Sequence, residues 1–175
     1  MLGVSWIKFS WNLKNLSEDI PPSDKNLKIT IGKKEDKENI LKNLESSYRM
    51  EHAWSIGIAD RLVELRRIVD EGIDHKKVDF LLIHDGPRMI GTSALYVNSK
   101  SDRQLLTGIC VLDEYRCRGA GSFLLYHSLK HLVSRGLETA SVVTRKNTAA
   151  AKFLYPKFDA ESESVIECKT PSDFA

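Results

Sequence analysis

Apolar residues recur along this chain with two different periods, and these periods predict a succession of strands and helices from residue 27 onwards. Short apolar or alternating runs predict strands at 27–31, 78–84, 89–97, 105–112, 139–144 and 164–169. Apolar positions three or four residues apart predict helices at 36–46, 53–71 and 148–155, and a further helix that carries Leu125, Leu129 and Leu132 and is closed by Gly136. The predicted order is therefore β-α-α-β-β-β-α-β-α-β.

Turn residues indicate how these elements connect. Asp85-Gly86-Pro87 is a turn sequence, so residues 78–84 and 89–97 predict an antiparallel hairpin. The strand–helix–strand unit over 105–144 predicts a parallel pair with a right-handed crossover. We expect an α/β fold with a mixed, mostly antiparallel central sheet and helices on both faces.

The N-terminal residues 1–26 are interpreted as an extension of one domain that covers 27–175. Residues 4–11 alternate loosely and are rich in aromatic and β-branched side chains, so they form either a strand or a docking arm. Residues 17–25 contain Pro21-Pro22 and indicate a linker. A chain of 175 residues is long enough to bury one proper core.

A loop with two arginines and two glycines follows the strand at 105–112. Arg116-Cys117-Arg118-Gly119-Ala120-Gly121 leads into a helix whose apolar face carries Leu125, Leu129 and Leu132. The first N–H groups of a helix lack partners, and glycines let an anion approach the backbone closely. The loop therefore predicts an anion site, although an ordinary glycine turn beside a basic helix is the other interpretation.

The distribution of charge favours the anion site. The net charge of the chain is only +2, but residues 116–157 hold eight Lys and Arg against one acid, Glu138. The rest of the chain thus carries a net charge of −5. This pattern suits a small polyanion better than a long nucleic acid, which usually needs a strongly basic domain.

Other functional classes find little support in the composition. Nothing approaches the roughly 18 apolar residues that span a membrane, and the first residues do not resemble a signal peptide. The three cysteines show neither a metal-ligand spacing nor a disulfide framework, which favours a reducing cytoplasm. His127 and His131 lie four residues apart without a third ligand, so no metal site is expected.

Two motifs, in this order of elements, resemble the GNAT superfamily of N-acetyltransferases. Arg116-x-x-Gly119-x-Gly121 after a strand is similar to its acetyl-CoA-binding motif, and residues 147–157 are similar to its second motif. The second match has departures. Tyr155 stands one residue late, Asp159-Ala160 replaces the common Gly-Phe, and only one strand is predicted after the last helix, where the family often has two.

The resemblance implies an acyl-CoA N-acyltransferase fold, acetyl-CoA as co-substrate and no metal. The pyrophosphate would lie on the loop, and the pantetheine arm would run along the preceding strand and be bonded by Asn147, which is also a good N-cap. The implied CoA-binding residues are Ile109, Cys110, Val111, Arg116, Arg118, Gly119, Ala120, Gly121, Ser122 and Asn147. Tyr155 is the implied acid that protonates the leaving thiolate, unless it is only a core tyrosine.

The acceptor site is predicted at a short segment between the first two helices. Tyr48, Glu51, His52 and Trp54 could hold a cationic amine by ion pairing and cation–π contact, although Arg49 could satisfy Glu51 instead. No general base is visible, because the strand at 104–111 carries no carboxylate.

The sequence therefore predicts a cytoplasmic enzyme that transfers an acetyl group from acetyl-CoA directly to a primary amine. A non-catalytic acyl-CoA-binding or regulatory domain is the alternative. A nucleic-acid-binding domain is disfavoured by the acidic balance outside 116–157. A homodimer remains open, and the pattern does not identify the amine.

Overall fold

A computed structural model describes residues 4–166, which form two antiparallel sheets. The larger sheet has the strand order β2 (Leu27–Ile31), β3 (Val78–Asp85), β4 (Arg88–Tyr96) and β5 (Cys110–Val111). In the smaller sheet, β1 (Trp6–Asn12) lies between β6 (Thr139–Arg145) and β7 (Glu161–Val165). The helices are α1 (Lys37–Met50), α2 (Ile58–Gly72), α3 (Ala120–Ser134) and the short α4 (Ala149–Phe153).

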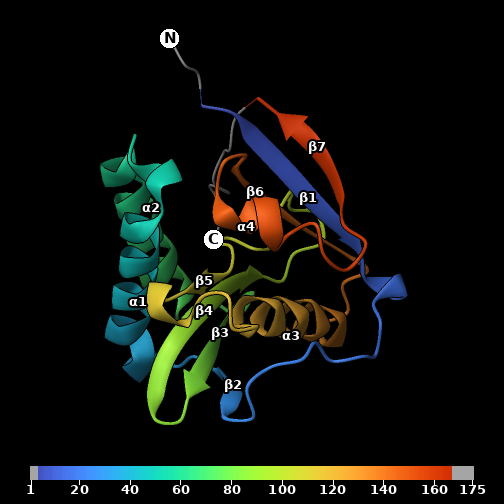
Figure 1. Ribbon diagram of the computed structural model, residues 1–175, viewed down its shortest axis with the longest axis horizontal. Coiled ribbons are helices and arrows are strands. Elements are labelled where there is room, and N and C mark those ends of the chain that lie inside the picture. Colours follow the sequence, from blue (N-terminus) through green and yellow to red (C-terminus); the bar gives the residue numbers. More distant parts are fainter. Residues whose placement is uncertain (1–3, 167–175) are drawn as a thin grey trace.

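Helices cover both faces of the larger sheet, which confirms the expected fold class. Figure 1 shows α1 and α2 together on one side of β3 and β4, with α3 on the other. Alternating residues of β3 supply the two cores. Leu81 and Ile83 pack with the leucines of α3, while Phe80 and Leu82 pack with α1 and α2. This period-2 alternation is what a strand buried on both faces requires.

The expected parallel pair between residues 105–112 and 139–144 is wrong. The two segments belong to different sheets, and every strand ladder within residues 4–166 is antiparallel. The two segments are joined by backbone hydrogen bonds near their first residues, where the N–H groups of Gln104 and Leu105 both donate to the Ser141 carbonyl, at 2.9 and 3.1 Å. Beyond that point they separate, and the sheet splits into two.

The predicted strand over 105–112 is also shorter than expected. Its regular pairing is confined to Cys110–Val111, with one isolated bridge between Leu105 and Leu95. Gly108 adopts a φ of +69°, which interrupts the extended backbone. Apolar composition alone does not reveal such a break, because the residues on either side of it remain buried.

The N-terminal segment forms a strand, which was one of its two interpretations. Residues 6–12 of β1 pair with 139–145 of β6, and residues 6–10 also pair with 161–165 of β7. Only one strand follows α4 within the described residues, so the N-terminus supplies its neighbour in the sheet. The polypeptide then passes α3, whose Tyr126 hydroxyl donates to the Ser17 carbonyl at 3.1 Å.

Two of the predicted helix starts are displaced. The second helix begins at Ile58 rather than at 53, because Gly57 has a φ of +79° and a short 3-10 turn, His52–Trp54, precedes it. The N-cap of α4 is Thr148 rather than Asn147. The Thr148 hydroxyl accepts the Ala151 N–H at 3.1 Å, while Asn147 is exposed.

The last strand begins earlier in the chain than predicted. The strand predicted at 164–169 is observed at Glu161–Val165, and residues 167–169, with Cys168, lie outside the described part. Within residues 4–166, none of the helices is both long and apolar enough to cross a bilayer.

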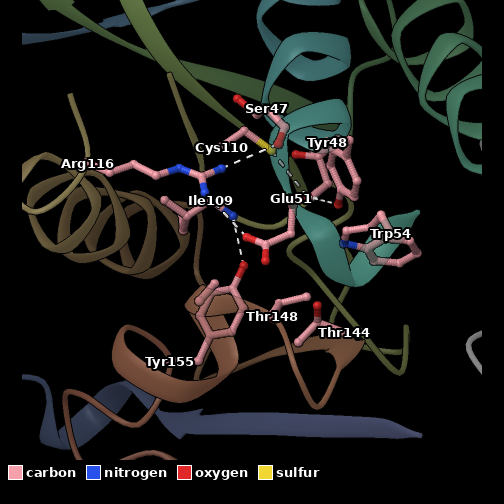
Figure 2. Close-up of a pocket in the computed structure, with 12 residues that line it drawn as sticks. Ser47, Tyr48, Glu51, Trp54, Ile109, Cys110, Arg116, Thr144, Thr148 and Tyr155 are labelled. Atoms are coloured by element: carbon pink, nitrogen blue, oxygen red, sulfur yellow. Dashed lines mark hydrogen bonds and ion pairs between the residues drawn. The ribbon is translucent and has the colours of Figure 1, made fainter. Parts of the chain in front are cut away.

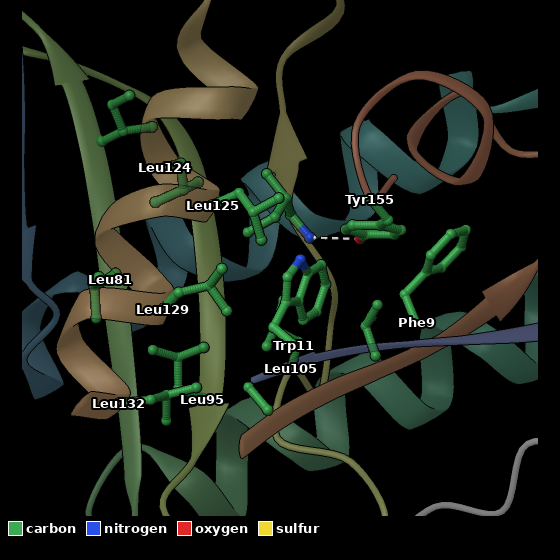
Figure 3. Packing of buried hydrophobic residues seen from close by; sticks show 14 of the residues in the cluster. Phe9, Trp11, Leu81, Leu95, Leu105, Leu124, Leu125, Leu129, Leu132 and Tyr155 are labelled. Atoms are coloured by element: carbon green, nitrogen blue, oxygen red, sulfur yellow. Dashed lines mark hydrogen bonds between the residues drawn. The ribbon is translucent and has the colours of Figure 1, made fainter. Parts of the chain in front are cut away.

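The N-terminal strand also contributes to the main core. Phe9 and Trp11 are 4% and 2% exposed, and the Trp11 indole N–H donates to the Lys157 carbonyl at 2.9 Å. Figure 3 shows both side chains beside Tyr155, next to the leucines of α3.

We expect Trp11→Ala to lower the free energy of unfolding by roughly 3–5 kcal/mol, because it opens a large cavity in the core and removes the hydrogen bond to the Lys157 carbonyl. Lys8→Ala, on the same strand but half-buried, should change it by about 0.5 kcal/mol. Urea unfolding followed by circular dichroism measures both. Equal stability of the two variants would show that β1 is not part of the cooperative core.

Candidate active site

The glycine loop connects β5 to α3 and leaves backbone N–H groups free of helical partners. After the 3-10 turn Asp113–Tyr115, the chain takes positive φ values at Cys117 (61°) and Gly119 (84°), and α3 begins at Ala120. Gly119 must be a glycine for a second reason, since a Cβ there would lie 2.8 Å from the Pro22 carbonyl oxygen. The N–H groups of residues 120–122 therefore open the helix without an acceptor inside it.

A cleft of about 350 Å³, here called the loop cleft, lies over this loop. It is lined by Glu51, Ile109, Val111, Arg116, Cys117, Gly119, Gly121, Ser122, Ala149, Ala150, Phe153, Leu154 and Lys157. Lys157 donates to the Ser122 hydroxyl at 2.6 Å, so a cation lies at the first turn of α3. Positive charge and free N–H groups on the same wall are suited to an anion.

A second, smaller cavity of about 50 Å³, here called the inner cavity, adjoins the loop cleft. It is lined by Ser47, Tyr48, Glu51, Trp54, Thr107, Ile109, Cys110, Arg116, Thr144, Thr148, Ala150 and Tyr155. Figure 2 shows these side chains converging from α1, β5 and the segment around α4. Four residues line both spaces: Glu51, Ile109, Arg116 and Ala150. They form the junction between the two spaces.

Arg116 points across this junction toward α1. Its Nε donates to the Val111 carbonyl at 3.3 Å, Nη2 donates to the Ser47 carbonyl at 3.4 Å, and Nη1 pairs with the Glu51 carboxylate at 3.4 Å. Arg49, which the sequence offered as the partner of Glu51, is exposed. The loop arginine therefore fixes the end of α1 against β5.

Tyr155 is buried at the inner end of the junction. Its hydroxyl accepts the Ile109 N–H at 2.9 Å, and its ring lies 5.7 Å from Phe9 and 6.2 Å from Trp11. Burial, with a smaller contribution from Tyr48, raises the pKa of Tyr155. The hydroxyl therefore keeps its proton at physiological pH. The positive φ of Gly108 matters here as well, since a Cβ on Gly108 would overlap the Tyr155 hydroxyl.

These cavities lie within the part of the chain that a known family covers. A model of the acetyltransferase (GNAT) family matches residues 41–159, which is well over half of the chain. The chain belongs to the GNAT family. Members of this family are in general acyltransferases. No curated protein sequence matches the chain.

Solved structures share the GNAT fold with this chain at low sequence identity. A Drosophila protein (12% identity, TM-score 0.61) and a GCN5-related N-acetyltransferase from Kribbella flavida (11%, 0.59) align with 92% and 91% of this chain but with 49% and 55% of their own. This chain thus spans about half the length of these two proteins. The PaiA N-acetyltransferase of Thermoplasma acidophilum, solved in complex with coenzyme A, is 19% identical (TM-score 0.51; 63% of this chain, 74% of its own).

Most residues that the GNAT resemblance assigned to CoA lie around the loop cleft. Ile109, Val111, Arg116, Gly119, Gly121 and Ser122 line it, Cys110 lines the inner cavity, and Ala120 is buried at the start of α3. Arg118 and Asn147 are exposed and line neither space. The CoA-binding roles of all ten residues stay predictions.

The predicted acceptor residues are partly brought together. Tyr48, Glu51 and Trp54 line the inner cavity, whereas His52 is exposed outside it. Cation–π binding of an amine by these rings stays a prediction. The Arg61 guanidinium lies 4.9 Å from the Tyr48 ring and 5.2 Å from the Trp54 ring, and that of Arg145 lies 4.2 Å from the Trp54 ring. Two guanidinium groups therefore already lie against these rings.

Several lining residues were missed by sequence reasoning. Ser47, Thr107, Thr144 and Thr148 give the inner cavity four small hydroxyl side chains, and Phe153, Leu154 and Lys157 form one wall of the loop cleft. A helical projection of residues 36–50 places Ser47 on the same face as Leu44 and Tyr48, so the sequence does indicate that Ser47 faces inward. The threonines carry no pattern that separates them from ordinary strand residues.

One histidine of the pair, His131, has a structural explanation. His131 lies 2.7 Å from the Asp79 carboxylate, which Arg135 also contacts at 2.6 Å. No group of three or more potential metal ligands is found among residues 4–166.

Cys110 offers a direct test of how closed the inner cavity is. Burial raises the pKa of its thiol to about 12, although the charges of Arg61 and Arg116 oppose the shift. At pH 8 only about one thiol in ten thousand is then ionised, and the thiolate is the reactive form. We expect iodoacetamide to label Cys110 at least about a hundredfold more slowly in the folded protein than in urea. Exposed Cys117 is the internal comparison, and peptide mass spectrometry resolves the two sites; equal rates at Cys110 would contradict a closed cavity.

Proposed function

We propose that this chain is an N-acetyltransferase that moves an acetyl group from acetyl-CoA directly to a primary amine. The junction of the loop cleft and the inner cavity at Ile109 carries the proposal. A thioester held there has its carbonyl carbon open to an amine that comes from the other side. Such positioning is a large part of the catalysis of a bimolecular transfer.

The loop cleft is suited to the CoA part of the donor. The pyrophosphate would lie on the N–H groups at the start of α3, with Lys157 beside it and Arg118 at the periphery. The pantetheine arm would follow residues 109–111, and Asn147 would contact it from the edge. The Thermoplasma acidophilum protein of the same fold was solved in complex with coenzyme A, which supports CoA as the ligand.

Tyr155 is suited to the role of the acid. Its hydroxyl accepts a hydrogen bond from Ile109 N–H, which leaves its own proton available to the leaving thiolate. The raised pKa means that the phenol still carries this proton when the donor binds. The amine would enter the inner cavity between Tyr48, Glu51 and Trp54, with His52 outside it. We also propose a cytoplasmic location, because the three cysteines show no disulfide framework in the sequence.

A thiol-release assay with acetyl-CoA and a panel of amines tests the proposal as a whole. The panel contains polyamines, amino acids, aminoglycosides and peptides with a free N-terminus or lysine. Release that depends on one class of amine supports the enzyme. CoA binding without any amine-dependent release would favour the non-catalytic acyl-CoA-binding domain.

Gly121→Glu should abolish CoA binding. The variant places a carboxylate where the pyrophosphate is expected, so like charges repel. The fold should tolerate it, because a Cβ at Gly121 meets only Leu154 methyl groups, at 3.5 and 3.7 Å. Ser134→Glu, on the exposed far end of α3, is the matched control and should bind CoA like the wild type. Titration calorimetry measures both; equal affinity in Gly121→Glu would move the site elsewhere.

Tyr155→Phe should lower kcat roughly ten- to a thousandfold and change the KM for acetyl-CoA little, since the loop supplies most of the binding. Tyr126→Phe removes another buried tyrosine hydroxyl, one that lines neither space, and should leave kcat unchanged. Steady-state kinetics with the best amine of the panel measures both variants. A wild-type kcat in Tyr155→Phe would assign this side chain to the core and the acid role to another group or to water.

A further inference from the structure

An amine that attacks a thioester must first lose a proton, because at neutral pH a primary amine is mostly a cation without a free electron pair. The strand that leads to Ile109 has no carboxylate to take that proton. The titratable and charged groups that line the inner cavity are Tyr48, Glu51, Cys110, Arg116 and Tyr155. One of them, or water, has to accept it.

Four of these groups are poor proton acceptors. The pKa of the Cys110 thiol is about 12, so the thiol stays protonated, and the raised pKa of Tyr155 keeps its phenol neutral. Arg116 is a permanent cation. Tyr48 donates its proton to the Thr107 carbonyl at 2.5 Å and accepts a hydrogen bond from Arg61 at 2.8 Å, so both functions of its hydroxyl are in use.

Glu51 is the remaining group, and its position fits the need. It ends α1 and is one of the four residues that line both the loop cleft and the inner cavity. Its side chain is only 17% exposed and is held by Arg116 at 3.4 Å. Figure 2 shows the carboxylate directed into the cavity, toward the region between Ile109, Thr148 and Tyr155.

Arg116 contacts only one of the two oxygens of this carboxylate. The guanidinium also contacts the Val111 and Ser47 carbonyls, and Asp113 lies 3.9 Å from it on the exposed side. The Glu51–Arg116 contact is a single one through Nη1 and Oε2. The other carboxylate oxygen has no described partner and is free to receive a proton.

A second observation indicates that the inner cavity is built for a polar ligand. The Ser47 hydroxyl, one helical turn before Glu51, belongs to a side chain that is 4% exposed and lines the cavity. It has no hydrogen-bond partner within the described residues. A buried hydroxyl without a partner is costly, and an amine N–H would satisfy it.

We propose that Glu51 is the general base of the acetyl transfer; the inference rests on the function proposed above. The Glu51 carboxylate takes one proton from the substrate ammonium group, and the freed nitrogen electron pair attacks the thioester carbon. The new C–N bond forms, the C–S bond breaks, and its electron pair leaves on sulfur, which takes the Tyr155 proton. The second proton of the attacking nitrogen restores the Tyr155 phenol, and Glu51 releases its proton to solvent.

Glu51→Gln tests this role against simple binding of the amine. A base acts in the chemical step, so kcat should fall about a hundredfold or more while the KM for the amine changes less than about threefold. Glu51→Asp, which keeps the carboxylate, should recover part of the rate.

Glu45→Gln is the matched control. Glu45 also lies on α1 and pairs with an arginine, Arg66, at 3.3 Å, but it lines neither space. It should keep the wild-type kcat. CoA affinity, measured by calorimetry, should stay within about twofold of the wild type in all three variants.

Each other outcome is decisive. A raised amine KM with an unchanged kcat in Glu51→Gln would show that Glu51 binds the amine, and would overturn the inference. An equal fall of kcat in Glu45→Gln would also overturn it, and so would a loss of CoA affinity in a Glu51 variant. An unchanged kcat in Glu51→Gln would overturn it in favour of water as the base. If the wild type acetylates no amine although it binds CoA, the proposed function itself fails, and the role of Glu51 falls with it.

Discussion

Beyond Leu105, the backbone pairing with β4 is interrupted between Thr107 and Ile109. Residues at this interruption line both the loop cleft and the inner cavity. A buried break normally leaves polar backbone groups without partners, which is costly. Here side chains replace the missing backbone. The Thr107 hydroxyl accepts the Ala94 N–H at 3.1 Å, and the Tyr155 hydroxyl accepts the Ile109 N–H at 2.9 Å. Because these hydrogen bonds satisfy the backbone N–H groups at the interruption, β5 and β6 can diverge and leave room for a ligand between them.

The N-terminal strand holds the other side of this opening in place. β1 lies between β6 and β7, and Phe9 and Trp11 from it pack against the Tyr155 ring. The indole of Trp11 also bonds the Lys157 carbonyl just after α4. The proposed acid and the Lys157 cation therefore both depend on residues about 145 positions earlier in the chain. That dependence explains why a segment outside the matched range 41–159 bears on the site.

The order of elements and the loop motif could be predicted from the sequence because both are local. Hydrophobic periodicity and the Arg-x-x-Gly-x-Gly spacing lie within single segments, and the fold class followed from them. The errors concern longer-range effects. The break at Gly108 depends on where Tyr155 packs, the cap of α4 depends on which of Asn147 and Thr148 is buried, and the partner of Glu51 proved to be Arg116, 65 residues away, rather than Arg49. Periodicity contains no information on such pairs.

The position of Arg116 changes how the loop motif is understood. Sequence reasoning assigned this cation to the pyrophosphate, but a guanidinium presents its donors in one rigid plane, and three of them here contact Val111, Ser47 and Glu51. The same residue thus belongs to the glycine loop through its backbone, and its side chain contacts the wall of the inner cavity. The positive charge at the mouth of the loop cleft then comes from Lys157 and the first N–H groups of α3. Since Arg116 lines both the loop cleft and the inner cavity, a change of this side chain would disturb both spaces, whereas Gly121 lines the loop cleft alone.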